Sequence, residues 1–181
     1  MIKINMGCGW RNFGKDWVHI DGGEYVHLDH KNIFKLPFDN NTVDLIYASH
    51  VLEYFDNEEV EVLLTEWKRV LKNDGILRIA VPDFYQMSSL YISGKIELKN
   101  ILGPLYGKMT MGNKKIYHKL VYDFKTLENK LKHSGFRDII KYDWKETEHS
   151  HFDDHSQAYI PHMDKEKGTL ISLNVECKNE F

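Results

Sequence analysis

The sequence predicts a doubly wound α/β fold, in which helices connect the strands of a mostly parallel sheet and the last strand runs antiparallel. Short apolar runs of strand length alternate with helical segments over most of the 181 residues, and parallel strands need such crossovers. Turn-forming glycines follow the first two runs. No helical pattern separates the last two runs, so the final strand is expected to form an antiparallel edge hairpin with its predecessor.

The first strands are short and end at turn signals. Residues 2–6 run into a glycine-containing turn, and residues 17–21 are closed by a glycine pair. Residues 25–28 are a candidate third strand. Residues 43–48 are a further strand, and a short helix is expected directly after it.

The best helix signal begins at Asp56, where Glu59 three residues on completes a capping-box pattern. Apolar residues then recur at helical spacing up to Leu71, and Gly75 is expected to end the helix because glycine tolerates the left-handed conformation of a C-cap. Residues 76–81 follow as a buried strand that stops at Pro82.

The second half of the chain is less regular. Residues 83–93 are predicted to be helical, residues 94–122 are an insertion broken by glycines, and a helix begins at Asp123 and ends at Gly135. Residues 137–144 and 169–177 are the last two strands. The long polar stretch between them, residues 145–168, is typical of a functional or disordered loop.

Composition limits the class of protein. With no repeat or linker, residues 1–181 are expected to form a single domain. A net charge of −3 speaks against a surface built for nucleic acid. Two cysteines suit a reducing compartment, and neither a secretory signal nor an apolar run long enough for a membrane span is present. The sequence therefore predicts a cytoplasmic protein without a nucleic-acid or membrane partner; its oligomeric state stays open.

The residues after each strand are the candidates for a ligand site, because ligands of such sheets bind outside the carboxyl ends of the strands. Gly7, Cys8 and Gly9 permit a tight turn and a close backbone approach to a ligand. Asp21 ends the second strand, where a carboxylate can accept both hydroxyls of a ribose; the alternative is that it only starts the glycine turn. Asn12 stands where a dinucleotide fingerprint needs a third glycine, which disfavours a nicotinamide-dependent oxidoreductase.

Four segments occur in an order typical of one enzyme superfamily. They are residues 5–9, residues 20–21, residues 36–53 with the pattern Leu-Pro-Phe-(x)5-Asp-Leu-Ile, and residues 69–83 with the pattern Arg-Val-Leu-Lys-x-x-Gly. Together they resemble the class I S-adenosylmethionine-dependent methyltransferases, in a compact branch often of unassigned substrate. The resemblance implies a seven-stranded sheet and S-adenosylmethionine as the cofactor.

The resemblance also implies roles for single residues. The glycine turn would cradle the methionine part of the cofactor, Asp21 would hold the ribose, and either Asp29 or Asn32 would be the polar residue beside the adenine. The full set of implied cofactor residues is Asn5, Gly7, Cys8, Gly9, Asp21, Asp29, Asn32, Ile33, Ser49 and His50. Two departures from the family are a neutral Asn5 in place of an acidic residue, and a first crossover too short for a full helix.

Methyl transfer needs little acid–base help beyond a base for a hydroxyl acceptor. His50, at the end of a central strand, and His155, in a His- and Asp-rich run of the polar loop, are the candidate catalytic residues. That run could alternatively be a solvated loop, and no metal-ligand spacing is present. We expect a methyltransferase acting on a small polar acceptor, such as a glycan or a sugar-containing metabolite. The alternative is a non-catalytic module of the same fold that binds a nucleoside or a protein.

Overall fold

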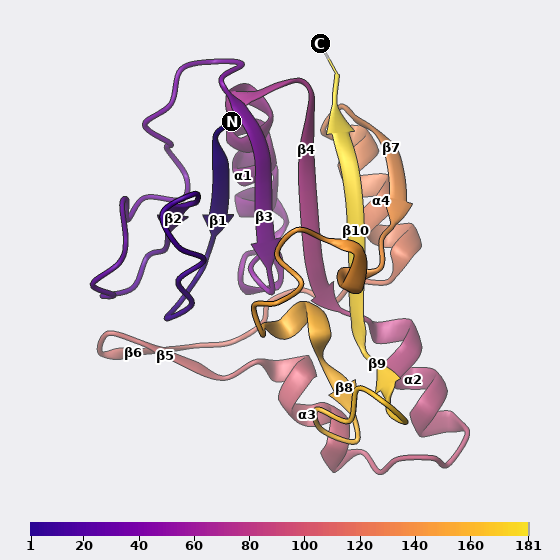
Figure 1. Cartoon of the computed structure of the whole chain (residues 1–181). Coiled ribbons are helices and arrows are strands. Elements are labelled where there is room, and N and C mark those ends of the chain that lie inside the picture. The colour runs from indigo at the N-terminus through magenta and orange to yellow at the C-terminus, as the bar shows by residue number, and fades with distance from the viewer. Residues whose placement is uncertain (181) are drawn as a thin grey trace.

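The computed structural model describes residues 1–180, and its centre is a mixed six-stranded sheet. The strands are β1 (Lys3–Met6), β2 (Val18–Ile20), β3 (Val43–Ser49), β4 (Leu71–Pro82), β7 (Phe136–Lys141) and β10 (Ser172–Asn179), in the spatial order β2-β1-β3-β4-β10-β7. The pairs β1–β2, β1–β3 and β3–β4 are parallel, and β10 is antiparallel to both of its neighbours (Figure 1). The predicted α/β fold with a mostly parallel sheet is confirmed.

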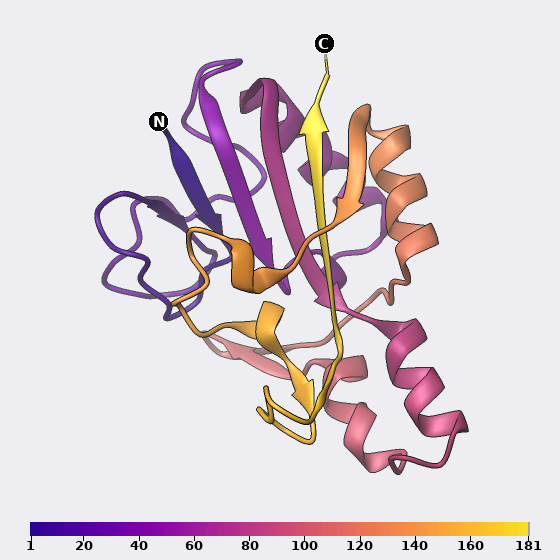
Figure 2. The same ribbon diagram turned by 45° about the vertical axis from the view of Figure 1, so that its right-hand side comes forward.

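The sheet differs from the prediction at both edges. Six strands are present instead of seven, since residues 25–28 form no strand and a single parallel bridge between Ile20 and His30 continues the sheet beyond β2. The last strand is not at the edge, because β10 lies between β4 and β7 (Figure 2). The segment predicted as one strand over residues 169–177 is divided: β9 (Thr169–Leu170) pairs with β8 (Tyr159–Ile160), and β10 follows.

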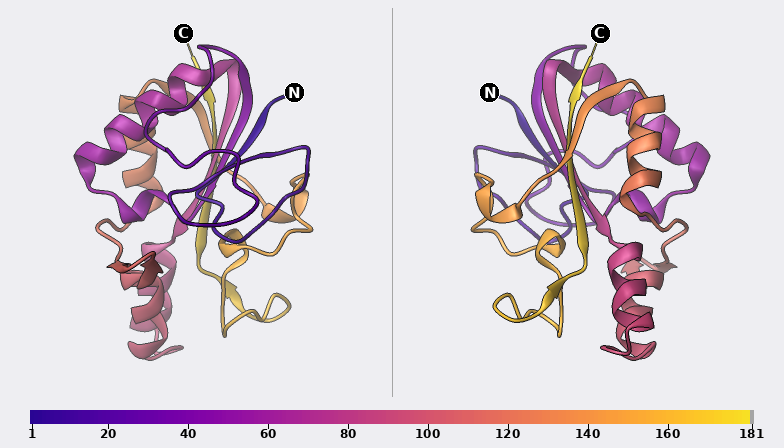
Figure 3. Two further views of the ribbon diagram at one scale, coloured as in Figure 1. Left: turned by 90° about the vertical axis from the view of Figure 1, so that its left-hand side faces the viewer. Right: turned by 90° about the vertical axis from the view of Figure 1, so that its right-hand side faces the viewer.

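Helices cover one face of the sheet (Figure 3). The helix α1 (Asn57–Val70) begins at the predicted capping box of Asp56 and Glu59, and α4 (Phe124–His133) begins at Asp123. Both helices bury their apolar stripes in the main core. The helix α1 ends before Gly75, contrary to the prediction, because Leu71 already pairs with Val43 in the sheet and residues 72–75 form an irregularity in β4.

Loops, rather than helices, cover the opposite face (Figure 3). Phe13, from the short β1–β2 connection, stacks on Phe152 of the β7–β10 connection at 4.3 Å between ring centroids, and His149 lies 4.0 Å from the ring of Tyr47 in β3. The β7–β10 connection contains two 3-10 turns, η2 (Trp144–Glu146) and η3 (His155–Gln157). Aromatic side chains thus replace a helical layer on this face.

The insertion lies at the carboxyl edge of the parallel strands (Figure 1). After α2 (Phe84–Ile92) it contains α3 (Lys99–Tyr106) and a hairpin of β5 (Met109–Met111) and β6 (Lys114–Ile116). The hairpin reaches toward β2, where a Cβ placed on Gly22 would lie 3.6 Å from the sulfur of Met111. None of the helices within residues 1–180 is long and apolar enough to cross a membrane.

Candidate active site

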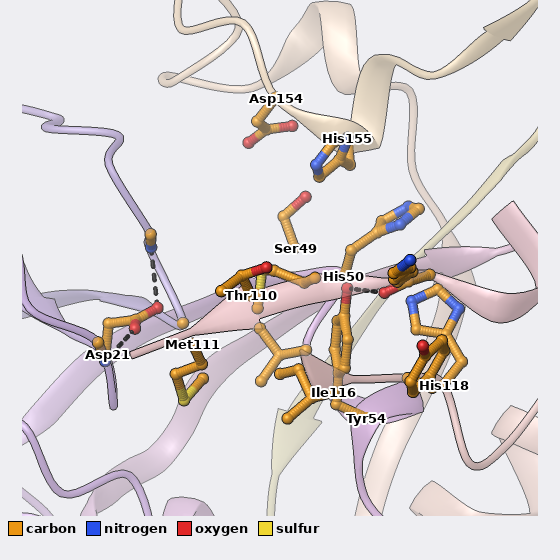
Figure 4. Close-up of a pocket in the computed structure, with 18 of the residues that line it drawn as sticks. Asp21, Ser49, His50, Tyr54, Thr110, Met111, Ile116, His118, Asp154 and His155 are labelled. Carbon is orange, nitrogen blue, oxygen red and sulfur yellow. Dashed lines mark hydrogen bonds between the residues drawn. The ribbon is translucent and has the colours of Figure 1, made fainter. Parts of the chain in front are cut away.

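The carboxyl ends of β1, β2 and β3 open into a cavity of about 1640 Å³. Its walls are the loops after β1 and β2, the end of β3 with the 3-10 turn η1 (Leu52–Tyr54), the insertion, and the segment around residues 154–163 (Figure 4). A pocket for one drug-sized ligand has a volume of roughly 300–1,000 Å³. The cavity therefore has room for two small molecules side by side.

The glycine turn and Asp21 meet on one wall of this cavity. The backbone nitrogen of Gly9 donates to Oδ2 of Asp21 at 2.9 Å, and that of Gly23 donates to Oδ1 at 2.6 Å (Figure 4). Each carboxylate oxygen keeps a further lone pair for a ligand hydroxyl. Gly7 has a φ of +62°, and a Cβ there would lie 2.4 Å from a methyl group of Val51, so only glycine fits.

Other predicted cofactor residues line the same cavity. They are Asn32, Ile33, Ser49 and His50. The side-chain oxygen of Asn32 accepts from the backbone nitrogens of Phe34 and Lys35, which fixes the turn that carries it. These hydrogen bonds are local to the loop and fix its shape beside the cavity.

Three predicted cofactor residues lie outside the cavity wall. Asn5 is buried in β1, and its amide nitrogen has no hydrogen-bond partner within residues 1–180. Cys8 is buried, and burial with the nearby Asp21 raises the pKa of its thiol to about 12. Asp29 accepts a hydrogen bond from the backbone of His19 at 2.8 Å, so of the two adenine-side candidates only Asn32 faces the cavity.

The two histidines that we considered as catalytic both line the cavity, 5.1 Å apart between ring centroids (Figure 4). His50 has both ring nitrogens close to protein atoms: Nε2 lies 3.3 Å from Oγ of Ser172, and Nδ1 lies 3.3 Å from Oε1 of Glu53. Burial, with the neighbouring His155, holds the pKa of His50 well below its usual range. The ring of His50 is therefore neutral.

His155 is placed differently. It lies on η3, its ring faces the open cavity, and no hydrogen bond within residues 1–180 engages its ring nitrogens. Burial and the charge of Arg11 lower its pKa. A neutral imidazole with an unused lone pair is able to accept a proton at neutral pH.

Most of the predicted His- and Asp-rich run points elsewhere. His149 is buried under the sheet, Glu148 forms an ion pair with Arg78 at 2.9 Å, and Asp154 accepts a hydrogen bond from Tyr47 at 2.6 Å. Only Asp154 and His155 of this run reach the cavity wall. Within residues 1–180, no group of three or more His, Cys, Asp or Glu side chains is arranged to hold a metal ion.

Sequence reasoning missed Glu53, whose side chain is fully buried behind the cavity wall. A carboxylate of this kind is almost never fully buried without a partner. Its position in the apolar run from Val51 to Phe55 was the available signal.

Comparisons with known proteins match one domain model and many solved structures of the same fold. The methyltransferase domain family model matches residues 6–79, a segment that contains the glycine turn, Asp21 and the end of β3. No curated protein matches the sequence.

Solved structures share the fold. A SAM-dependent methyltransferase from Archaeoglobus fulgidus is 17% identical with a TM-score of 0.59, and the match covers 98% of this chain and 85% of that one. One from Methanosarcina mazei is 16% identical with a TM-score of 0.58, covering 99% and 92%. The 1,6-didemethyltoxoflavin-N1-methyltransferase of Burkholderia thailandensis, with bound S-adenosylhomocysteine, is 11% identical with a TM-score of 0.57, covering 99% and 71%. A methyltransferase domain is thus matched over residues 6–79, and the chain has the class I fold of the S-adenosylmethionine-dependent methyltransferases, a match that implies S-adenosylmethionine as the cofactor.

Proposed function

We propose that this enzyme methylates a hydroxyl group of a small molecule, with the cofactor in the half of the cavity nearest β1 and β2. The observation that carries the proposal is the meeting of the glycine turn and Asp21 on one wall of a cavity with room for two ligands. Gly7 and Gly9 bring backbone close to the methionine part, and Asp21 holds the ribose hydroxyls. Asn32 and Ile33 contact the adenine.

His155 is the base in this proposal. S-adenosylmethionine supplies an electrophilic methyl group on a positively charged sulfur, so a hydroxyl acceptor needs only to lose its proton. The unengaged ring of His155 would take that proton as the acceptor oxygen bonds to the methyl carbon, while the bond from that carbon to sulfur breaks and S-adenosylhomocysteine leaves. His50, with both ring nitrogens turned to protein atoms, supports the ring of His155 at 5.1 Å.

The side chains on the other walls of the cavity indicate which kind of acceptor would bind there. Side chains without charge predominate on the wall formed by the hairpin and residues 158–171: Met109, Met111, Ile116, Ala158, Ile160, Pro161, Met163 and Ile171. Apolar walls select apolar ligand surface, and a few polar groups fix its orientation. The acceptor thus carries a polar, hydroxyl-bearing end at Ser49 and His155. A sugar joined to an apolar body fits both walls.

The proposed cofactor site is tested by the variant Asp21→Asn, with Asp29→Asn as the matched control. Calorimetric titration with S-adenosylhomocysteine should show at least tenfold weaker binding for D21N, because the amide loses an acceptor that the ribose needs. D29N should bind like the wild type, since Asp29 does not line the cavity. Equal affinity of D21N and wild type would remove Asp21 from the ribose site.

The base is tested by His155→Ala in a screen of hydroxyl compounds that have an apolar body. Turnover should fall on the order of 100-fold, the range of general base catalysis, while the affinity for S-adenosylhomocysteine is unchanged. Undiminished turnover would exclude His155 as the base.

A further inference from the structure

Glu53 has no charged partner in its buried position. Neither carboxyl oxygen has a hydrogen bond of good geometry within residues 1–180. Oε1 of Glu53 lies 3.3 Å from Nδ1 of His50 and 3.8 Å from Nε2 of His118. Lys119, next in the chain, turns its ammonium group to Asp56 and Glu59.

The contact of Nδ1 shows which ring nitrogen of His118 carries the proton. Nδ1 of His118 lies 2.9 Å from the backbone oxygen of Pro104, which only accepts hydrogen bonds. Nδ1 therefore carries the proton. Because burial lowers the pKa of His118, the ring is neutral and Nε2 presents a lone pair toward Glu53.

A second chain of hydrogen bonds places the proton on His50. The side-chain nitrogen of Asn174 donates to the backbone oxygen of Ser156, which fixes the Asn174 oxygen as the acceptor for the Ser172 hydroxyl at 2.9 Å. The oxygen of Ser172 is then left to accept from Nε2 of His50. A neutral His50 thus presents its bare Nδ1 to Glu53.

Both neighbours of Glu53 therefore offer lone pairs, and only a protonated carboxyl group can bond to either of them. We infer that Glu53 is protonated at neutral pH and is a positioning residue, whose hydroxyl donates to Nδ1 of His50 and fixes the tautomer and orientation of that ring beside His155. Burial agrees with this assignment, since it raises the pKa of Glu53 to about 8. The nearby phenols of Tyr54 and Tyr122, whose pKa values Glu53 raises further, are neutral and supply no compensating charge.

The catalytic meaning of this inference rests on the proposed role of His155, but the location of the proton is tested without an acceptor. The variants are Glu53→Gln, whose amide can replace the donor; Glu53→Leu, which has no donor; and Glu61→Gln, an exposed control on α1. Nitrogen–proton NMR spectra of the histidine rings at pH 7, assigned with His50→Gln and His118→Gln, report each tautomer.

We expect His50 to be neutral with its proton on Nε2 in the wild type and in E53Q, and to exchange between tautomers in E53L. A doubly protonated His50 in the wild type at pH 7 would overturn the inference, because Glu53 would then be ionised. The melting temperature gives a second readout. As the pH rises from 6 to 9, the melting temperature of the wild type should fall relative to that of E53Q, because Glu53 loses its proton and the glutamine does not titrate. The melting temperature of E61Q should follow that of the wild type. A constant difference between wild type and E53Q would also overturn it.

Failure of the proposed function has a different result. If S-adenosylhomocysteine does not bind but the spectra and melting curves are as expected, the protonation of Glu53 is supported and the proposed cofactor site is wrong. Once an acceptor is found, E53Q should keep turnover within about threefold and E53L should lose at least tenfold in kcat with KM for the cofactor unchanged.

Discussion

Among single residues, His149, on the loop-covered face of the sheet, makes the free energy of unfolding depend on pH. Its Nε2 lies 3.2 Å from a guanidinium nitrogen of Arg78, which also binds Glu148 and Glu176. Burial, and then the charge of Arg78, lowers the pKa of His149 to about 4. The folded protein thus binds a proton at this site more weakly than the unfolded chain does, and acid favours unfolding between pH 6.5 and 4.

The variant His149→Phe removes this titration and keeps an aromatic ring. A pKa lowered from 6.5 to about 4 corresponds to about 3 kcal/mol at 1.36 kcal/mol per unit. Between pH 7 and 4, H149F should therefore lose about 3 kcal/mol less of its free energy of unfolding than the wild type, measured by urea denaturation at each pH. Equal losses would mean that His149 is protonated without cost to the folded state.

The residues of the site were predictable where backbone geometry dictated them. The glycine turn and Asp21 follow adjacent parallel strands, so their meeting could be expected from the strand order. The apolar run around Glu53 indicates its burial, but its proximity to His118 of the insertion, 65 positions further along the chain, could not be expected. No local pattern predicts that contact.

Among the elements, the β5–β6 hairpin combines an exposed surface with a place on the cavity wall close to the loop after β2. Most of its side chains are exposed, and Met111 and Ile116, which are partly buried, are among those that line the cavity. The hairpin therefore adds little to the core but forms part of the cavity wall.

Replacing residues 109–116 by a short Gly-Ser turn should leave the free energy of unfolding within about 1 kcal/mol, since few buried groups are lost. Release of S-adenosylhomocysteine, followed by stopped-flow competition, should be at least tenfold faster. Asn113→Ala is the control, because Asn113 is exposed and lies outside the cavity wall. An unchanged release rate would show that the hairpin does not retain the ligand.

Elements with strong local signals were predicted well, and those defined by distant partners were not. The capping box of α1 and the cap of α4 are local, and both helices begin where predicted. Residues 25–28 have a strand-like composition but contain a turn, and only His30, further on, bridges to the edge strand β2. The end of α1 was placed too late because pairing of Leu71 with Val43 overrides the helical spacing.

At the scale of the whole molecule, Asn179 joins the last strand to the end of α1. Its side-chain nitrogen donates to the backbone oxygens of Lys68, Leu71 and Lys72 at 3.1, 2.9 and 3.2 Å, and the residue is fully buried. These contacts satisfy carbonyl groups where the helix turns into β4. One side chain thus connects α1, β4 and β10.

Asn179→Ala should lower the free energy of unfolding by about 2–3 kcal/mol, because buried carbonyl groups lose their donor. Lys178→Ala is the matched control on the same strand, since its surface ion pair with Asp138 contributes under about 1 kcal/mol. Urea denaturation measures both. If N179A were as stable as K178A, the α1 end would be held by other contacts.

The interior position of β10 has a consequence for synthesis on the ribosome. The strands β1 to β4 can pair as they emerge, but β7 has no neighbour until residues 172–179 leave the exit tunnel. The nascent chain therefore carries α4 and β7 as an undocked arm, with Leu127 and Leu131 open to chaperones until translation has passed the last strand.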